Sequence, residues 1–436
     1  MIEKQKLKPI SGFPEWLPEV RMVEMAWIDK IRAVFESYGF APIETRSVEP
    51  VEVLLKQGDT DKEIYTLRRL MEDEASTSEA DYALHYDLTV PMARYVAANL
   101  NDLTFPFKRY QIQRAWRGER PQDGRYREFT QCDIDVVDTR DIPLHFDAEM
   151  PAIVYQVMQA LEVGPTVTRI NNRKVLEGFY RGLGIEQAHD VIRIVDKQDK
   201  IGAHGVTKML SEELSLDEST IAKVLELAEI TGTKADVVER VRALGVSGAL
   251  LEEGLEELHF VMKQLESYPE GAFVADLSIA RGLAYYTGTV YEVKFADDPS
   301  FPTICGGGRY ENLVGSMLNK HLPGIGISIG LTRIFSKLVK DGKIAPSRKT
   351  PTEVMVCHLP GASYEEVNAV AVALRARGLK TEQFHEARKL KQQLAYAANK
   401  GIPYVWFPAV GDDGRHEVKT LATGEQRDAD PAVWLP

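Results

Sequence analysis

Hydrophobic positions recur along the chain with two different periods, which predicts a mixture of helices and strands. Apolar side chains at helical spacing predict helices over residues 20–38 and 147–162, and Gly39 ends the first of them. Between residues 105 and 137, two alternating segments flank a polar turn at residues 121–124. This pattern predicts a long antiparallel hairpin with a charged loop.

The same pattern divides the chain into regions. Residues 185–268 carry three short amphipathic helical patterns, and strand signals return directly afterwards, so we expect a helical insertion there. A polar segment rich in Pro and Gly then precedes a β-α-β-α-β pattern, which predicts a separate α/β domain. The expected organisation is a first core segment, the insertion, a second core segment, a linker and a C-terminal domain, over residues 1–184, 185–268, 269–340, 341–350 and 351–436.

Composition is that of an ordinary globular protein and excludes several classes. The chain has 436 residues, of which 44% are hydrophobic and 27% charged, and its formal net charge is −12. These values exclude a disordered or collagen-like chain, and there is no apolar run of about 18 residues that would predict a membrane span. The charged N-terminus has no apolar signal core, and three scattered Cys give neither a disulfide framework nor a zinc site. We therefore expect a cytoplasmic protein with no metal site of its own, and its acidic balance argues against a general nucleic-acid coat.

Two clusters of polar residues lie in the first core segment. Residues 87–91 (DLTVP) are typical of a helix start with a polar cap. Residues 114–127 contain five Arg beside aromatic rings, which suits phosphates and a purine base, although a solvated hairpin loop has the same composition. Gln131 and Asp135 follow at a spacing of four, so their side chains share one face of the expected strand.

Two further clusters lie in the second core segment. A Tyr-Tyr pair in a strand is usually core, but packing does not account for Arg281 just before it. Residues 306–310 (GGGRY) and 324–333 (GIGISIGLTR) are rich in glycine, which turns, bulges and close strand approach also require. They lack the strand–GxGxxG–helix arrangement of a dinucleotide site. Arg333, at the entry of the last core helix, is the informative residue of this cluster.

In this order the clusters resemble the histidyl-tRNA synthetases, a family of class II aminoacyl-tRNA synthetases. RGERPQDGRYREF resembles class II motif 2, GIGISIGLTR resembles motif 3, and ARGLAYYTG and CGGGRY resemble the two histidine motifs of the family. DLTVP, QCDIDV and KQQLAYAANKGIPYVWF match the same pattern. The resemblance covers nearly the whole chain. It implies an α+β fold, with a class II synthetase antiparallel sheet flanked by helices, a helical insertion and a C-terminal α/β anticodon-binding domain.

The resemblance also implies an activity. A member of this family is an ATP-dependent ligase that activates L-histidine to histidyl-adenylate with release of pyrophosphate, and then transfers histidine to the 3′ end of its tRNA. ATP is expected with Mg²⁺, and a homodimer is expected because motif 1 of class II enzymes lies at the subunit interface. Arg117 and Arg281 match the catalytic positions that hold the α-phosphate and the carboxylate. The ATP positions are matched by Arg117, Glu119, Arg125, Phe129 and Arg333.

The remaining matches concern histidine and tRNA. Asp135, Tyr285 and Tyr286 match positions that hold the imidazole, and Asp87, Thr89 and Gln131 match contacts to the ammonium group. The full set of histidine positions is Asp87, Leu88, Thr89, Arg117, Gln131, Asp135, Arg281, Tyr285 and Tyr286. The tRNA candidates are Arg120 and Gln122 in the motif 2 loop, and Arg388, Lys389 and Lys391 on an expected helix over 386–400, for which a solvated helix face is the alternative.

Two departures and two alternatives accompany the resemblance. Arg46 stands near the place where motif 1 normally has Pro, and Ala284 stands where the family often has Asp. A catalytically silent paralogue, the regulatory subunit of ATP phosphoribosyltransferase, shares the catalytic fold but generally lacks the tail domain and the intact Arg-Gly-Leu-x-Tyr-Tyr signature, both of which are present here. Another class II synthetase is disfavoured by the Tyr pair and Asp135.

Overall fold

The computed structural model describes residues 8–55, 63–69, 81–279, 286–311, 313, 320–346, 348–410 and 414–436. The chain forms two compact units, one made mainly of Trp27–Asp341 and the other mainly of Gly342–Pro436. Near the N-terminus the boundary between them falls inside helix α1 (Pro18–Ser37). In the part of the chain that the structure describes, no helix combines the length and apolar character needed to cross a membrane.

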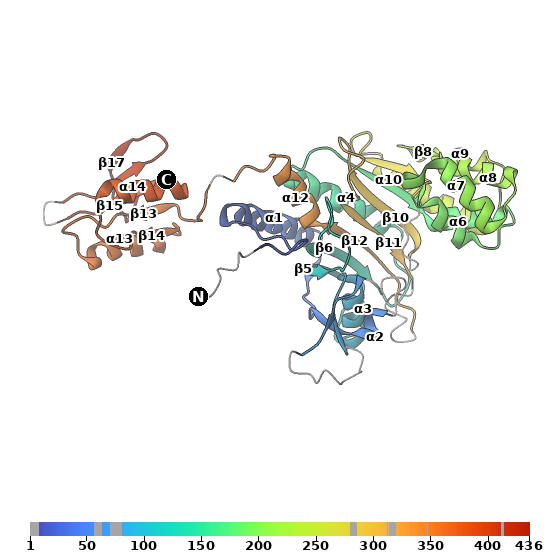
Figure 1. The fold of residues 1–436 in the computed structure, drawn as a ribbon, viewed down its shortest axis with the longest axis horizontal. Helices are drawn as coiled ribbons and strands as arrows, with labels where there is room; N and C mark the ends of the chain where they lie inside the picture. Colours follow the sequence, from blue (N-terminus) through green and yellow to red (C-terminus); the bar gives the residue numbers. More distant parts are fainter. Residues whose placement is uncertain are drawn as a thin grey trace, which may run out of the picture. The chain divides into compact units, whose positions relative to one another are not determined.

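A nine-stranded sheet is the framework of the larger unit (Figure 1). Its strand order is β1-β5-β6-β12-β11-β10-β7-β9-β8, and every pair from β5 to β7 is antiparallel. The predicted hairpin is confirmed, because β5 and β6 pair along their whole length on either side of the charged loop. The strands are β1 (Ala41–Pro42), β5 (Phe107–Trp116), β6 (Glu128–Val137), β7 (Thr166–Asn172), β8 (Thr231–Gly232), β9 (Phe273–Asp276), β10 (Tyr286–Phe295), β11 (Cys305–Tyr310) and β12 (Gly324–Gly330).

Helices flank this sheet, so the predicted α+β class is confirmed. Helix α4 (His145–Leu161) packs against β12 and β7, α10 (Ala249–Leu265) against β7 and β9, and α12 (Leu331–Lys340) against β6. On α1, the ring of Phe35 lies 5.9 Å from that of Tyr110 on β5. Since side chains alternate along a strand, the neighbours of Tyr110 point to the other face of the sheet.

A smaller sheet precedes the hairpin. It has the order β2-β4-β3 and is followed by a helix that leads toward β5. Strand β3 of this sheet is only two residues long. The elements are β2 (Val48–Pro50), α2 (Val51–Leu55), β3 (Thr66–Leu67), β4 (Tyr82–Leu84) and α3 (Thr89–Ala98).

A group of helices lies between β7 and β9 in sequence, and α6 to α9 cluster together (green in Figure 1). The three predicted helical patterns correspond to α8, α9 and α10, whereas α5, α6 and α7 were not predicted. Helices α5 and α10 approach very closely, because a Cβ added at Gly178 would lie 2.4 Å from the backbone nitrogen of Leu251. The bounds are α5 (Arg173–Gly182), α6 (Ala188–Val195), α7 (Gln198–Leu214), α8 (Glu218–Ala228) and α9 (Val237–Arg242).

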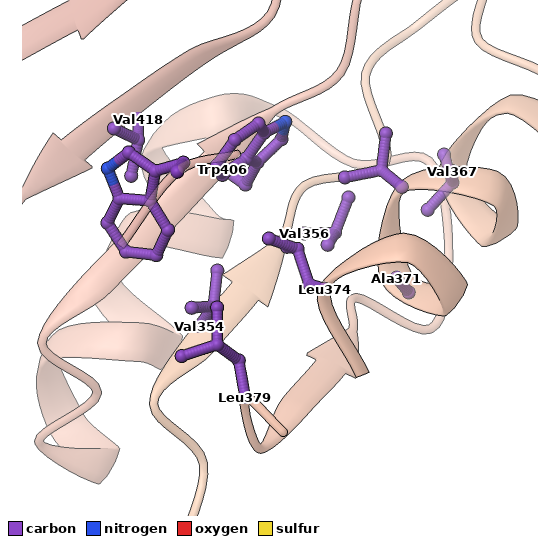
Figure 2. Close-up of a cluster of buried hydrophobic side chains, with 10 residues drawn as sticks. Val354, Val356, Val367, Ala371, Leu374, Leu379, Trp406 and Val418 are labelled. Atoms are coloured by element: carbon purple, nitrogen blue, oxygen red, sulfur yellow. The ribbon is translucent and has the colours of Figure 1, made fainter. Parts of the chain in front are cut away.

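The smaller unit has a five-stranded sheet of order β14-β13-β15-β16-β17. Strand β13 is parallel to both neighbours, as the β-α-β-α-β pattern predicts, and two antiparallel strands that were not predicted follow. Helix α13 begins at a capping box formed by Ser363 and Glu366. It packs Leu374 into a core with Val356 and Trp406 (Figure 2). The elements are β13 (Val354–Val356), α13 (Tyr364–Ala376), β14 (Thr381–Gln383), α14 (Leu390–Lys400), β15 (Tyr404–Phe407), β16 (Glu417–Thr420) and β17 (Gln426–Asp428).

Candidate active site

Polar side chains share one face of the central strands of the large sheet. Because side chains alternate, Gln131, Asp133 and Asp135 of β6 all point to the same side. The strand register places polar or glycine residues of both neighbouring strands beside them. These neighbours are Gln113, Gln111 and Arg109 on β5 and Gly330, Ser328 and Gly326 on β12.

A first cavity, which we call the arginine cavity, lies between the base of the hairpin loop and strands β11 and β12. Four of the five residues that match ATP positions line it, namely Arg117, Glu119, Phe129 and Arg333. The fifth, Arg125, lines a larger cavity next to it, to which Arg333 also contributes. The remaining lining residues are Gly124, Tyr126, Thr130, Gln131, Thr303, Ile304, Cys305, Gly306, Ser328 and Gly330.

Two guanidinium groups, those of Arg117 and Arg333, line the arginine cavity, and that of Arg125 in the neighbouring cavity lies close enough to act on Arg333. Arg333 donates hydrogen bonds to the carbonyl oxygens of Gly124, at 2.5 Å, and of Thr303. Burial, together with the positive charges of Arg117 and Arg125, lowers the pKa of Arg333 to about 10. Such a concentration of positive charge, with the donors of Arg333 anchored on backbone carbonyls, is suited to a phosphate-bearing ligand.

The other arginines of this cavity have defined partners. The Nε of Arg117 donates to the carbonyl oxygen of Tyr86 at 3.0 Å, and its guanidinium carbon lies 5.2 Å from the centre of the Phe129 ring. Arg125 donates to a carboxylate oxygen of Glu119 at 2.8 Å. Arg117 is therefore held by backbone at one side, and a nucleotide that uses both Glu119 and Arg125 has to separate that ion pair.

A second cavity, which we call the carboxylate cavity, adjoins the first. Four residues line both cavities: Arg117, Gln131, Gly306 and Ser328. The carboxylate cavity is lined in addition by Asp87, Thr89, Asp133, Asp135, Tyr286, Tyr310, Gly326 and Ile327. Arg117 and Arg333 thus belong to one connected site, and the predicted residues Asp87, Thr89, Gln131, Asp135 and Tyr286 are brought together at its other end.

The Asp135 carboxylate is fixed by two groups that the sequence did not point to. One oxygen lies 2.5 Å from a guanidinium nitrogen of Arg109, which is fully buried, and the other accepts from the hydroxyl of Tyr310 at 2.9 Å. Burial raises the pKa of Asp135 to about 6, against the opposing effect of Arg109. A Cβ at Gly326 would lie 2.0 Å from Oδ1 of Asp135, so glycine is needed at position 326 for this carboxylate to fit.

Two glycines of strand β11, like Gly326, leave space that a side chain would fill. A Cβ at Gly308 would lie 2.8 Å from the ring of Tyr286, and one at Gly307 would lie 2.0 Å from the carbonyl oxygen of Gly326. These two glycines make room for other parts of the protein, whereas Gly306 lines both cavities.

The helix-start interpretation of residues 87–91 is also correct. Asp87 accepts a hydrogen bond from the backbone N–H of Val90 at 3.1 Å, and α3 begins at Thr89. Burial raises the pKa of Asp87, which lines the carboxylate cavity. Leu88 is fully buried and is not among the residues that line either cavity. Arg281, Ala284 and Tyr285 lie outside the described residues.

The tRNA candidates lie at two surfaces. Arg120 and Gln122 are exposed in the hairpin loop, where Gln122 forms a tight backbone pair with Arg125. In the smaller unit, Arg388, Lys389 and Lys391 are exposed. The expectation that all three lie on one helix was wrong, because α14 begins only at Leu390 and Lys389 has an extended backbone.

Sequence reasoning gave no role to three residues that line the carboxylate cavity, Asp133, Tyr310 and Ser328, nor to Arg109, which pairs with Asp135. Asp133 had a signal, since it lies between two predicted residues of the same strand face. The others required knowledge of which strands are neighbours. At the motif 1 departure, Arg46 binds the buried carboxylate of Glu49, which also binds Arg94.

Comparison with known proteins gives the same family as the motifs. The family model described as histidyl-tRNA synthetase matches residues 12–334. A histidine–tRNA ligase of Thermobifida fusca is 57% identical over 98% of this chain and 97% of its own length, and one of Micrococcus luteus is 47% identical over 98% and 96%. The crystal structure of histidyl-tRNA synthetase from Nostoc sp. PCC 7120 superposes with a TM-score of 0.85 at 38% identity, covering 98% of this chain and 97% of that one.

A second solved structure shares the fold at lower identity. It is described as an ATP phosphoribosyltransferase regulatory subunit/histidyl-tRNA synthetase from Bacillus halodurans C, with a TM-score of 0.75 and 20% identity over 94% of this chain and all of that one. At that identity the likeness concerns the fold alone. On the family model and the close relatives, this chain belongs to the histidyl-tRNA synthetase family.

Proposed function

We propose that this protein is a histidine–tRNA ligase. In the first step a carboxylate oxygen of L-histidine attacks the α-phosphorus of ATP, and pyrophosphate leaves as histidyl-adenylate forms. In the second step a ribose hydroxyl at the 3′ end of the tRNA attacks the carbonyl carbon of histidine, and AMP leaves. The observation that supports this most strongly is that Arg117 lines both cavities, so that it can contact the carboxylate and the α-phosphate together.

The arginine cavity is the proposed site of ATP. Arg117 stabilises the negative charge that develops at the α-phosphate, and Arg281 is proposed to act with it. Phe129 and Arg333 would hold the two faces of the adenine ring, and Glu119 would accept from its amino group once it leaves Arg125. Arg125 would then be free for the terminal phosphates. Positioning and charge stabilisation suffice for this displacement, and no protein nucleophile is required.

Mg²⁺ is proposed to enter with the nucleotide, as part of the ATP substrate. Among the residues that the structure describes, no group of three or more His, Cys, Asp or Glu side chains is arranged to hold a metal ion. An ion carried by phosphate oxygens and water needs few protein ligands, which fits this finding.

The carboxylate cavity is the proposed site of histidine. Asp135 is oriented by Arg109 and Tyr310, so it presents a fixed acceptor to an imidazole nitrogen, and Tyr286 is proposed to contact the ring together with Tyr285. Asp87, Thr89 and Gln131 are proposed for the ammonium group. Buried polar groups select strongly, because an amino acid without matching donors leaves them unpaired.

The rest of the assignment concerns tRNA and assembly. The hairpin loop, with Arg120 and Gln122, is proposed to meet the acceptor end, and the C-terminal domain over residues 351–436 is proposed to read the anticodon. Residues 1–184 and 269–340 are proposed as the catalytic core, with residues 185–268 inserted. A homodimer in the cytoplasm is proposed from the family.

Histidine-dependent exchange of pyrophosphate into ATP tests the first step, and charging of histidine tRNA tests the second. The wild-type protein should do both, and only histidine should support exchange in a panel of amino acids. Arg117→Lys should lower exchange at least 100-fold, since lysine lacks the forked guanidinium. Arg114→Lys is the matched control, because Arg114 is exposed on β5 and pairs with Glu128 outside the cavities. A folded protein without exchange would favour the regulatory alternative.

A further inference from the structure

The side chain of Asp133 is a buried acid for which the matched histidine positions give no function. It lies on β6 between Gln131 and Asp135, lines the carboxylate cavity and is 2% exposed. In the register of the sheet it is paired with Gln111 on one side and Ser328 on the other. No cation is paired with it directly in the described part of the chain, and Arg109, which lies near enough to act on it, is paired with Asp135.

One oxygen of Asp133 has no hydrogen-bond partner in the part of the chain that the structure describes. The Ser328 hydroxyl, which itself accepts from the side-chain nitrogen of Gln131 at 2.7 Å, is hydrogen-bonded to the Asp133 carboxylate. Oδ1 of Asp133 has no hydrogen-bond partner among the described residues, and neither has Oε1 of Gln131. Asp135 differs, because both of its oxygens are engaged. Two neighbouring side chains therefore present buried acceptors that a ligand can satisfy, and such atoms are expensive to leave unpaired.

The charges around Asp133 favour a cation. Asp135 from the same strand and Asp87 from the segment before α3 are also acids, and Arg109 from β5 is the positive group that acts on Asp133. Burial, with these acids, raises the pKa of Asp133 to about 7, against the effects of Arg109 and Ser328. A ligand with a positive charge would therefore stabilise the ionised carboxylate.

The position of Asp133 indicates which part of histidine it meets. Its partner Ser328 lines both cavities, as do Gln131 and Arg117, so this is the end of the carboxylate cavity that adjoins the proposed α-phosphate. Asp135 lines the carboxylate cavity only. The α-carbon of an amino acid whose carboxylate lies at Arg117 must lie next to that boundary, with its ammonium group close to Asp133.

We propose that Oδ1 of Asp133 binds the α-ammonium group of histidine, together with Oε1 of Gln131 and the carboxylate of Asp87. The inference rests on the proposed function. An ammonium group has three donors and no acceptor, which matches the three acceptors offered here. Asp133 is then a residue that selects a free, positively charged amino group and rejects ligands in which that group is missing.

The test uses Asp133→Asn in the full-length protein and three ligands measured by calorimetry at pH 8. Histidine and histidinol carry the ammonium group and the imidazole, whereas 3-(imidazol-4-yl)propionate carries the imidazole and the carboxylate but no ammonium. The variant should weaken binding of the first two at least 10-fold and leave the third unchanged within twofold. Asp138→Asn is the matched control, since Asp138 is buried just beyond the same strand and binds the backbone of Thr139; it should leave all three affinities unchanged.

Each outcome decides the matter. Equal weakening of all three ligands would mean that Asp133 supports the cavity as a whole or meets the imidazole, and unchanged affinities would mean that it meets nothing; both overturn the proposal. Absence of histidine-dependent exchange in the wild-type protein would instead refute the proposed function.

A second measurement needs no variant, in case Asp133→Asn fails to fold. Near pH 7, once the protons released by each ligand's own imidazole are subtracted, histidinol binding to the wild-type protein should release more protons than binding of 3-(imidazol-4-yl)propionate, because only the ammonium group drives Asp133 to ionise. Calorimetry in two buffers of different ionisation enthalpy measures this, and equal proton release would overturn the proposal.

Discussion

The substitution Gly326→Ala tests the geometry of the carboxylate cavity directly. The added methyl carbon would lie 2.0 Å from Oδ1 and 2.5 Å from Cγ of Asp135, and 2.9 Å from the carbonyl oxygen of Ile134. Ordinary contact begins at 3.4 Å, so the carboxylate would have to move by about 1.4 Å (3.4 − 2.0) or the strands would have to separate. Such a movement would break the 2.9 Å hydrogen bond from Tyr310 and disturb the pair with Arg109.

The expected loss of stability and of histidine affinity follows from the burial of the Arg109–Asp135 ion pair. Arg109 is fully buried, and leaving a buried charge without its partner costs about 3–5 kcal/mol. Whole proteins are stable by only about 5–15 kcal/mol, so the larger unit should unfold several degrees lower. The dissociation constant of histidine should rise at least 100-fold, which corresponds to about 2.7 kcal/mol, while ATP affinity changes little.

The assay combines thermal unfolding with calorimetric titration of histidine and, separately, of ATP. Gly330→Ala is the control on the same strand, because its Cβ would meet nothing closer than the carbonyl oxygen of Ile304 at 3.1 Å. It should keep histidine affinity within about twofold. If Gly326→Ala bound histidine as the wild type does and unfolded at the same temperature, the requirement for glycine beneath Asp135 would be refuted.

Four further predictions concern the same site and the sheet that carries it. Arg333→Lys should raise the KM for ATP at least 10-fold and leave that for histidine unchanged, since lysine cannot hold both backbone carbonyls in the fixed geometry of a guanidinium; steady-state exchange measures both. Arg309→Met should lower the unfolding temperature, because it leaves the fully buried Asp147 without its ion-pair partner; equal stability of the variant would contradict this. Asp133 and Asp135, with pKa values raised to about 7 and about 6, should be protonated as the pH falls, so histidine affinity should drop between pH 7.5 and 5.5, and Asp133→Asn should flatten the upper part of that profile. Because the folded protein binds these protons more tightly than the unfolded chain, the same two acids should lower the stability of the unliganded protein as the pH rises from about 4 to 7.

Elements with strong local patterns were predictable from the sequence. The β5–β6 hairpin has alternation on both sides of a turn, and α13 has a capping box, so each could be recognised without knowledge of the rest. Helix α7 was missed because Gly202, with φ of 69°, interrupts its helical geometry and its apolar spacing. Strands β16 and β17 were missed because they are short and polar, and they are stabilised by pairing, β16 with β15 and β17 with β16.

The residues of the candidate site likewise fall into those that the sequence predicted and those that it did not. Asp135 and Arg117 were found because the motifs of the family carry them. Arg109 was missed because its importance depends on strand register, which places it opposite Asp135 although the two lie far apart in the sequence. Asp133 could have been found by the alternation of strand faces, but nothing in the sequence indicates that one of its oxygens lacks a partner.

The glycine-rich motifs and the buried acids of this site depend on one another structurally. A sheet face that carries two carboxylates and two tyrosine rings needs space beside the neighbouring strands, and glycine at 308 and 326 supplies that space where any Cβ would collide. Oδ1 of Asp133 has no hydrogen-bond partner among the described residues, so a ligand in the cavity can supply its donor. Part of the stability of the empty protein is thereby given up in exchange for selectivity, since an amino acid without the matching donors gains nothing by entering. The variant Asp133→Asn, which leaves no buried cation without its ion-pair partner, should therefore gain stability above pH 7 as it loses affinity for histidine.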